Sequence, residues 1–301
     1  MNSCIRVIDV GGNGFRRADV YGDEVKSLVA SEPIKTVEEA IQFSKTDMPS
    51  STIAISFASA GVIEDHDLIE KSPNVAVLSG VRLGSLVRKE TGLPSIVCND
   101  MEAAAIGMSI LFPNLPYFMG ITWSSGIGAR VVKNKEIISE SEVGHICLDN
   151  SPYAMLCGCG LRGCAEAILS GDAIKRRVVS EVSLRCIDIP ATMHPCALFD
   201  QELSRRAKWA EEIKELIVEG MATFLANIQS TFCLPAIVWK GNFAQQMDRA
   251  VFAKIKLRMM TKIINPTWVE RLEFWFSPQD PKDKDSFLGA AAIAKKVLSL
   301  C

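Results

Sequence analysis

Three cysteines lie close together in the chain, in the eight-residue segment Cys157-Gly-Cys-Gly-Leu-Arg-Gly-Cys164. His145, one of only three histidines in the sequence, lies twelve residues before the first of them. Three thiolates and one imidazole complete the tetrahedral shell of a structural Zn²⁺ site. The intervening glycines let the backbone turn several sulfurs towards one point. The sequence therefore predicts a structural zinc site with His145, Cys157, Cys159 and Cys164 as ligands.

Two other interpretations of these cysteines stay open, namely chance clustering and a redox pair. Cys157 and Cys159 are closely spaced for a disulfide, and the segment has no Cys-x-x-Cys motif of the thioredoxin type. Disulfide scaffolds are short and secreted, whereas this chain has 301 residues and no secretory signal pattern within residues 1–12. We therefore expect a reducing, cytoplasmic compartment. The remaining cysteines are then free thiols: Cys4, Cys98, Cys147, Cys186, Cys196, Cys233 and Cys301.

The composition is that of a globular protein. Hydrophobic residues make up 48% and charged residues 23% of the chain, which suits a sizeable core in two domains or one large domain. Because 33 basic residues nearly balance 35 acidic ones, no general positive field attracts nucleic acid or an anionic membrane. The sequence has no run of about 18 apolar residues, the length of a membrane span. The charge balance also argues against a zinc-ribbon nucleic-acid module, since Arg162 is the only cation of the cysteine segment.

Predicted strands alternate with predicted helices, which indicates α/β layers. The chain opens with an apolar strand over residues 4–10 that ends in a glycine turn, and residues 16–21 are consistent with a returning strand. A similar pattern at residues 117–132 suggests an internal duplication. We expect two domains, 1–112 and 113–285, with a closing helix at 286–301 that packs on the first. Other helices are predicted at 37–44, 81–91, 101–111 and 209–232, strands at 51–57, 93–98 and 235–239, and a charged loop at 278–285.

Two short motifs at predicted strand ends could carry chemistry. Asp9-Val-Gly-Gly-Asn-Gly14 combines small residues, which let a polyphosphate approach the backbone, with a carboxylate that can hold a magnesium-bound water. The same residues also suit an ordinary hairpin turn, and the Walker and Rossmann phosphate patterns are absent. In Asn99-Asp100, the carboxylate could act as a general base and the amide could hold a hydroxyl-rich ligand. The alternative is an aspartate that simply caps the helix at 101–111.

The order of the motifs resembles that of the ROK family of sugar kinases, over nearly the whole chain. The resemblance implies the actin-like, ribonuclease H-like α/β fold, with two domains and a cleft between them. Its most specific part is the zinc signature, which comprises Glu142-x-Gly-His145 and residues 157–166. The other matching segments are the phosphate motifs at 9–16 and 125–128, the sugar loop at 61–65 and 72–74, the catalytic segment Asn99-Asp100-x-x-Ala-Ala and the C-terminal Leu288-Gly-Ala-Ala291.

The resemblance implies a role for each matching residue. Asp100 is expected to be the general base that takes the proton from the attacking sugar hydroxyl. A zinc ion on one ring nitrogen of His145 would fix the ring, so that the other nitrogen can hold a sugar hydroxyl. The other residues expected at the sugar are Gly61, Asn74, Asn99, Glu142 and Glu166. Those expected at ATP and its Mg²⁺ are Asp9, Gly11, Gly12, Asn13, Ser125, Gly126, Gly128 and Gly241.

The implied activity is ATP-dependent phosphorylation of a hexose or an N-acetylhexosamine, with N-acetylmannosamine and glucose favoured and fructose behind them. Three departures from the family pattern lie on the nucleotide side. Asn13-Gly14 replaces the usual threonine and a basic or polar residue, Ala129 replaces a glycine, and Trp239-Lys240 interrupts a glycine run. A sugar-binding protein without kinase activity is therefore the alternative.

Two further expectations concern assembly. The resemblance suggests a homodimer whose other partners are the sugar and ATP. Some members of the family are transcriptional repressors with an added helix-turn-helix domain. Because the first predicted strand begins by Cys4, we expect no such domain here.

Overall fold

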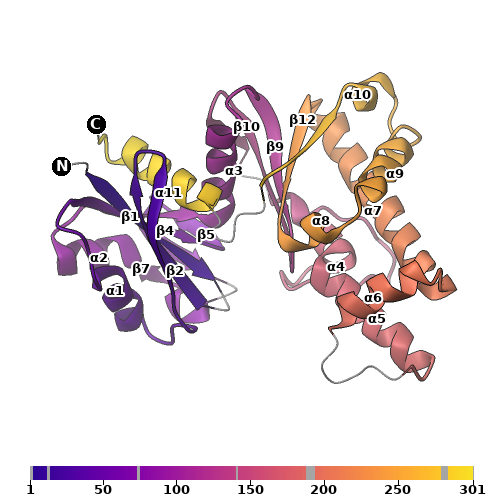
Figure 1. Cartoon of the computed structure of the whole chain (residues 1–301), viewed down its shortest axis with the longest axis horizontal. Helices are drawn as coiled ribbons and strands as arrows, with labels where there is room; N and C mark the ends of the chain where they lie inside the picture. Colours follow the sequence, from indigo (N-terminus) through magenta and orange to yellow (C-terminus); the bar gives the residue numbers. More distant parts are fainter. Residues whose placement is uncertain are drawn as a thin grey trace. The chain divides into compact units, whose positions relative to one another are not determined.

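The structure is a computed structural model that describes residues 3–11, 14–72, 75–139, 142–187, 194–278 and 284–300 (Figure 1). It divides into two compact units. The first unit comprises Met1–Gly120, Arg130–Glu140 and Pro278–Cys301, and the second comprises Ile121–Ala129 and Ser141–Ser277. No helix among the described residues is long and apolar enough to cross a membrane. Four residues with predicted roles lie outside the described ranges: Gly12, Asn13, Asn74 and Cys301.

The first unit contains a five-stranded sheet in the order β3-β2-β1-β4-β8. Its first three strands form an antiparallel meander, β4 lies parallel to β1, and β8 lies parallel to β4. Gly11 pairs with Gly14, so β1 and β2 form a hairpin. This agrees with the interpretation of the first glycine motif as a hairpin turn. The strands are β1 (Cys4–Gly11), β2 (Gly14–Tyr21), β3 (Glu24–Ala30), β4 (Thr52–Ser59) and β8 (Ser95–Asn99).

Alternate side chains of β1 enter two separate cores, as expected for a strand that is covered on both faces. Ile5 and Val7 pack in the same core as Phe287 of α11. Ile8 packs in a second core, together with Leu83 of α2. The helices of this unit are α1 (Val37–Lys45), α2 (Leu83–Thr91), α3 (Asp100–Leu111) and α11 (Lys284–Val297), with a short 3-10 turn at Ala76–Leu78.

One charged side chain of β1 is fully buried. Arg6 is 2% exposed, and its Nε donates at 2.9 Å to Oδ1 of Asp19, its cross-strand partner on β2. Its Nη1 also donates to the carbonyl oxygens of Ser44 and Thr46, at 3.2 Å and 2.6 Å. A buried ion pair is tolerated only when such further partners satisfy its remaining polar atoms. The pair therefore ties the C-terminal end of α1 to β1 and β2.

Helices α3 and α11 approach each other more closely than larger side chains allow. A Cβ atom added at Gly289 of α11 would lie 1.7 Å from the carbonyl oxygen of Ala103 in α3. A Cβ atom added at Gly107 of α3 would lie 1.8 Å from the carbonyl oxygen of Asp285. Both distances are far below van der Waals contact, so only glycine fits at these positions. The crossing holds α3, which begins at Asp100.

A three-stranded sheet, β5-β6-β7, completes the first unit. The sequence predicted a helix over residues 81–91, but its first two residues pair with β6, because Val81 lies opposite Ile69 and Arg82 lies opposite Leu68. Helix α2 therefore begins at Leu83. The strands are β5 (Val62–Glu64), β6 (Leu68–Lys71) and β7 (Val81–Arg82).

The other five-stranded sheet has the order β11-β10-β9-β12-β13. Like the first sheet, it joins three consecutive strands to two later ones, so the repeated sequence pattern corresponds to a repeated strand order. Strands β12 and β13 are parallel. The strands are β9 (Tyr117–Trp123), β10 (Ile127–Lys133), β11 (Glu136–Ser139), β12 (Ala236–Lys240) and β13 (Glu273–Phe276).

Helix α7 (Lys208–Phe232) is the longest helix among the described residues, and it follows the predicted helix within one residue. Its apolar residues recur at three- and four-residue steps, and Leu216 is only partly buried. The buried ones are Ile213, Ile217, Met221, Phe224, Leu225 and Ile228. Trp239 of β12 packs against the rings of Trp123 and Phe252. The other helices are α4 (Ala165–Leu169), α5 (Gly171–Leu184), α6 (Pro195–Ser204), α8 (Asn242–Gln246), α9 (Arg249–Met259) and α10 (Thr267–Glu270), with a 3-10 turn at Val143–His145.

The charged loop predicted at 278–285 is wrong at its C-terminal end. Lys284 and Asp285 belong to α11, and Asp285 is only 4% exposed. Its backbone lies against Gly107, and its Oδ1 accepts the N–H of Ser286 at 2.9 Å. Packing against α3 therefore lets α11 begin at Lys284, two residues before the predicted start at residue 286. Residues 279–283 lie outside the described ranges.

We predict that Gly289→Ala destabilises the protein by about 1–3 kcal/mol, because the added Cβ must push the backbone of α3 away. The free energy of unfolding from urea denaturation measures the effect. Lys295→Ala, on the exposed side of the same helix, is the control and should stay within about 0.5 kcal/mol of the wild type. Equal stability of the two variants would contradict the close crossing.

Candidate active site and metal centre

The first turn of α3 carries the predicted catalytic segment. Oδ1 of Asn99 accepts hydrogen bonds from the backbone N–H groups of Met101 and Glu102, at 2.9 Å and 3.2 Å. The Glu102 side chain accepts in return from the N–H of Asn99 at 3.4 Å, which completes a capping box. The N-cap residue is therefore Asn99 and not Asp100, although Oδ1 of Asp100 also accepts the N–H of Met101, at 2.8 Å. Asp100 is the first helical residue and is half-buried.

The amide of Asn99 connects three parts of the first unit. The residue is 8% exposed. Its Nδ2 donates to the carbonyl oxygen of Gly61 at 3.0 Å, and its Oδ1 accepts from Nη2 of Arg130 at 3.2 Å. Two residues predicted to contact a sugar, Asn99 and Gly61, are thus in direct contact, and Asp100 is the next residue along the chain.

Arg130 is a residue of this site that the sequence motifs did not predict. It lies on β10 and is 4% exposed. The sequence did contain a signal, because Arg130 interrupts a run of apolar and small residues, Ile127-Gly-Ala-Arg-Val-Val132. A charged residue in a buried strand requires a polar partner nearby.

Asp9 lies near the end of β1 and forms an ion pair with Arg16, its cross-strand partner on β2. Nε of Arg16 donates to Oδ2 of Asp9 at 2.9 Å, and Nη2 donates to the same oxygen. The pair is partly open to solvent, with Asp9 16% and Arg16 34% exposed. Gly11 follows on the same strand and lines a cavity of about 340 Å³ together with Lys35 and Val75.

The second glycine turn connects β9 to β10 and is shorter than predicted. The N–H of Ser124 donates to the carbonyl oxygen of Gly126 at 3.0 Å, which closes the turn around Ser125. Ile127 and Gly128 already belong to β10. Strand pairing therefore begins inside the segment that composition assigned to the turn.

Two neighbouring helices hold this turn. The N–H of Gly171, at the start of α5, donates to the carbonyl oxygen of Ser124 at 2.7 Å. Oε2 of Glu166, in the first turn of α4, accepts the N–H of Ile127 at 3.0 Å. The predicted sugar ligand Glu166 is thus bonded to the strand that follows the predicted phosphate turn.

The predicted metal ligands come from three short segments of the second unit. His145 ends a 3-10 turn, and Cys164 directly precedes α4. Cys157 and Cys159 lie in a tight turn that is closed by the N–H of Cys157, which donates to the carbonyl oxygen of Leu161 at 2.8 Å. The three segments are joined by further backbone hydrogen bonds.

A glycine makes this junction possible. Gly163 has a positive φ of 74°, and an added Cβ would lie 1.7 Å from the carbonyl oxygen of Asp149. The carbonyl oxygen of Gly163 also accepts the N–H of Leu148 at 2.7 Å. The chain can therefore turn at Gly163 and bring Cys164 beside the segment that follows His145.

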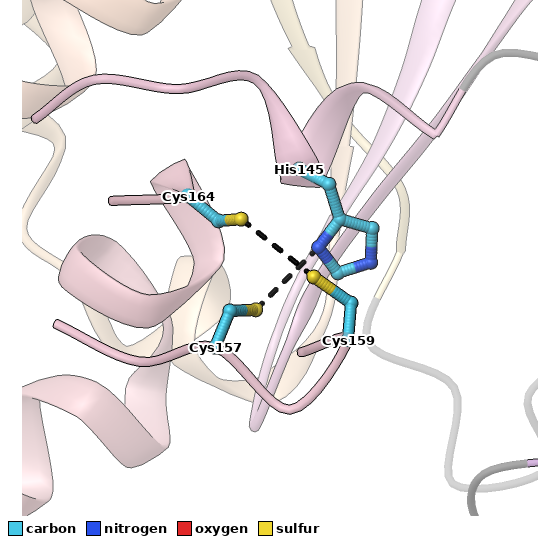
Figure 2. A group of neighbouring side chains, drawn as sticks. All are labelled: His145, Cys157, Cys159 and Cys164. Atoms are coloured by element: carbon cyan, nitrogen blue, oxygen red, sulfur yellow. Dashed lines mark hydrogen bonds between the residues drawn. The ribbon is translucent and has the colours of Figure 1, made fainter. Parts of the chain in front are cut away.

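The four candidate ligand atoms lie within 4.8 Å of one another (Figure 2). Sγ of Cys157 is 3.6 Å from Nδ1 of His145, and Sγ of Cys159 is 3.7 Å from Sγ of Cys164. With Zn–S near 2.3 Å and Zn–N near 2.05 Å, a tetrahedral site has edges of about 3.8 Å between sulfurs and about 3.6 Å between sulfur and nitrogen. These two edges match, so the donor set and its spacing fit a tetrahedral zinc ion. Figure 2 shows one ring nitrogen of His145 facing the sulfurs and the other directed away from them.

The thiols of the cluster influence one another. Burial, together with hydrogen bonds to Cys159 and Cys157, raises the pKa of Cys164 to about 12. Burial also raises the pKa of Cys157. For Cys159 burial acts in the same direction, but hydrogen bonds, first that with the backbone of Leu161, outweigh it and lower the pKa. Cys164 therefore keeps its proton at neutral pH unless a cation replaces it.

The remaining predicted residues of the second unit lie around this cluster and on β12. Glu142 is exposed and immediately precedes the turn that carries His145. Oε1 of Glu166 lies 3.9 Å from Sγ of Cys157, from which it accepts a hydrogen bond. Gly241 follows β12 and caps α8. Glu142, His145 and Glu166 thus belong to one region of the second unit, whereas Gly61, Asn99 and Asp100 belong to one region of the first.

A family model described as the ROK family matches residues 7–297. The chain belongs to the ROK family. Among curated proteins, this ROK-family chain is 26% identical over 248 residues to the N-acetylmannosamine kinase of Escherichia coli (strain 55989 / EAEC). The aligned segment covers 78% of this chain and 81% of that protein.

Two solved structures resemble this ROK-family chain in fold. A ROK-family glucokinase from Streptomyces griseus, in complex with glucose and AMPPNP, has a TM-score of 0.78 at 20% identity and covers 98% of this chain and 100% of its own. The ROK hexokinase from Thermus thermophilus has a TM-score of 0.79 at 21% identity and covers 98% of this chain and 99% of its own. The actin-like α/β fold predicted from the sequence is confirmed.

We predict that Asn99→Ala lowers the free energy of unfolding by about 0.5–2 kcal/mol, because α3 of this ROK-family chain loses its cap. Asn99→Asp keeps the acceptor for Met101 and Glu102, so it should lose less stability. Thermal denaturation of both variants measures the difference. The same loss in both would show that the cap contributes little.

Proposed function

We propose that this sugar kinase of the ROK family transfers the γ-phosphoryl group of ATP, with Mg²⁺, to a hydroxyl of a hexose or an N-acetylhexosamine. N-acetylmannosamine and glucose are the first candidates, and fructose follows. The observation that carries the proposal is the position of Asp100, a half-buried carboxylate in the first turn of α3, directly after the capping residue. The curated relative named N-acetylmannosamine kinase supports the first of these sugars.

Asp100 is proposed as the general base. The partial positive charge of a helix N-terminus favours an ionised carboxylate by about 0.3–1 kcal/mol, and only the ionised form can accept a proton. As the sugar hydroxyl attacks the γ-phosphorus, its O–H bond breaks towards the Asp100 carboxylate, a P–O bond forms, and ADP leaves with the bridging oxygen. Such a transfer depends mainly on positioning and charge neutralisation.

The sugar is proposed to be held by polar side chains and by the loop at Gly61. Carboxylates accept hydrogen bonds from hydroxyls, and the Asn amide can both accept and donate. In the first unit, the contact between Asn99 and Gly61 supports a common role at the sugar. The proposed sugar ligands are Gly61, Asn74, Asn99, Glu142, His145 and Glu166.

The cluster of His145, Cys157, Cys159 and Cys164 is proposed to hold a structural zinc ion. One sulfur–sulfur distance and one sulfur–nitrogen distance support it, because they match two of the six edges of a tetrahedral site. When bound, the metal holds its ligands in one fixed arrangement. Nδ1 of His145 faces the sulfurs, so Nε2 of the same ring is left to bond a sugar hydroxyl (Figure 2).

The nucleotide is proposed to contact both glycine turns and the segment after β12. Gly241 precedes Phe243, and Phe243 lines a cavity of about 390 Å³ together with Phe199, Asp200 and Met247. The lining combines two aromatic rings with polar and charged side chains, among them Lys214 and Gln246. A planar base such as adenine could stack on the rings and form hydrogen bonds with the polar groups. The proposed contacts to ATP and Mg²⁺ are Asp9, Gly11, Gly12, Asn13, Ser125, Gly126, Gly128 and Gly241.

A second candidate function is sugar binding without phosphoryl transfer. The observation in its favour is the ion pair of Asp9 with Arg16. An aspartate that holds a magnesium-bound water must share its oxygens with the hydrated cation, and one oxygen of Asp9 already accepts two hydrogen bonds from Arg16. The departures at Asn13 and Ala129 point in the same direction.

We also propose that the chain acts as a homodimer. A reducing, cytoplasmic compartment is proposed as well, since zinc thiolates must remain reduced. All nine cysteines of the described residues are free thiols. Residues 1–112 with 286–301, and residues 113–285, are proposed as its two domains.

Asp100→Asn is expected to lower kcat by about 10²–10⁴-fold, because the amide cannot accept the proton. The sugar Kd from calorimetry should change little, since the amide keeps the size of the carboxylate. A coupled assay with ATP, Mg²⁺ and a panel of hexoses and N-acetylhexosamines provides kcat. Asp23→Asn, on an exposed turn, is the control.

A variant as fast as the wild type would exclude Asp100 as the base. Sugar binding without measurable nucleotide binding or turnover would instead favour the second candidate. Turnover of glucose but not of N-acetylmannosamine would reverse the order of the two sugars.

Metal analysis of the purified protein is expected to find about one zinc per chain, as a closed four-ligand site requires. Cys159→Ser should lose most of the metal and lower the melting temperature, because binding energy of the ion contributes to folding. Cys186→Ser changes an exposed thiol outside the cluster and should keep both. A wild-type protein without zinc, and insensitive to chelators, would contradict the site.

A further inference from the structure

Arg130 is a buried cation whose role the proposed function does not include. Its side chain is 4% exposed, on a strand whose neighbouring residues are apolar or small. Taking a guanidinium out of water costs several kcal/mol unless hydrogen bonds replace the lost solvent. Its Nη2 donates to Oδ1 of Asn99 at 3.2 Å. The guanidinium therefore forms a hydrogen bond with the side-chain amide of Asn99.

That amide oxygen is shared by three donors. The N–H groups of Met101 and Glu102 approach it at 2.9 Å and 3.2 Å, and Nη2 of Arg130 approaches it at 3.2 Å. Hydrogen bonds from a charged donor are roughly twice as strong as neutral ones. Arg130 thus holds Oδ1 of Asn99 in the orientation that also caps α3.

The same orientation directs the other end of the amide. Nδ2 of Asn99 donates to the carbonyl oxygen of Gly61 at 3.0 Å. A rotation of the amide would break this bond and the two bonds of the helix cap together. One guanidinium on β10 therefore fixes the spacing between the first turn of α3 and the loop that follows β4.

We propose that Arg130 is a positioning residue for the kinase reaction and that it acts through Asn99. By fixing the amide, it sets where Asp100 lies relative to Gly61. The inference rests on the proposed function, because positioning matters for catalysis only if Asp100 and Gly61 face the same sugar. A displacement of about 1 Å in a reacting group can cost about a hundredfold in rate.

The first test compares Arg130→Met, Arg130→Lys and Arg17→Met. We expect Arg130→Met to lower kcat by about ten- to a hundredfold and to raise the sugar KM less, whereas Arg130→Lys, which keeps the charge and a donor, recovers part of the loss. Arg17 is a matched control, because it is 5% exposed in the same unit and bonds to Phe43 and Asp47 instead. Arg17→Met should lower the melting temperature and leave kcat unchanged.

The second test is a double-mutant cycle with Asn99→Ala. If Arg130 acts through Asn99, Arg130→Met should reduce kcat little further in the Asn99→Ala protein. Fully additive losses in kcat would overturn the proposal. Equal kcat losses in Arg130→Met and Arg17→Met would also overturn it, because they would indicate general destabilisation.

Hydrogen exchange separates this inference from the proposed function. The amides of Met101 and Glu102 donate to Asn99, so they should exchange faster in Arg130→Met and at the wild-type rate in Arg17→Met. This result in a protein that phosphorylates no sugar would sustain the positioning of Asn99 and refute the kinase proposal. If these amides exchange at the wild-type rate in Arg130→Met, the positioning of Asn99 by Arg130 is refuted, whatever the kinase activity. If the methionine variant does not fold, the same measurement on Arg130→Lys decides.

Discussion

The hydrogen bonding at the N-terminus of α3 is the constraint on which the candidate site depends. The first N–H groups of a helix have no partners within the helix. For Met101 and Glu102, Asn99 supplies the acceptor from a side chain that is itself 8% exposed. The amide then needs a donor and an acceptor of its own, which Arg130 and the carbonyl oxygen of Gly61 provide. Each partner is required by the one before it. The residue that follows, Asp100, inherits a position that four hydrogen bonds determine.

The cysteine cluster meets a similar requirement by different means. Its ligands lie on three short segments with little regular structure, and these are joined by backbone hydrogen bonds such as that between Leu148 and Gly163. Such segments have few apolar contacts to stabilise them, so an ion that bonds to all of them would contribute much of their order. Glu166 extends this order to β10, because it lies beside Cys157 and accepts the N–H of Ile127. Loss of the proposed ion would therefore also disturb the start of β10, which follows the second glycine turn.

Local patterns predicted those features that a short stretch of sequence determines. The spacing of the ligand residues located the cluster, and the apolar period located α7, because both are properties of contiguous chain. The start of α2 and of α11 were missed, since pairing of Val81 with Ile69 and the contact of Asp285 with Gly107 join distant segments. Arg130 was missed for the same reason, because its partner Asn99 lies 31 residues away. A lone arginine in an apolar strand, as also at Arg6, is nevertheless a signal that a buried acceptor exists.

The strength of the Asp9–Arg16 pair bears on the choice between a kinase and a sugar-binding protein. Two arginine–aspartate pairs link β1 to β2, and they differ in exposure. Arg6 and Asp19 are each 2% exposed, so separating them would leave buried charges and cost about 3–5 kcal/mol. Arg16 is 34% exposed, and a pair that reaches solvent contributes only about 0–1 kcal/mol. The Asp9–Arg16 pair, in which Asp9 is 16% exposed, is therefore weaker than the buried pair and costs less to separate. The weaker of the two pairs thus lies beside the proposed phosphate turn, which favours the kinase proposal over the sugar-binding alternative.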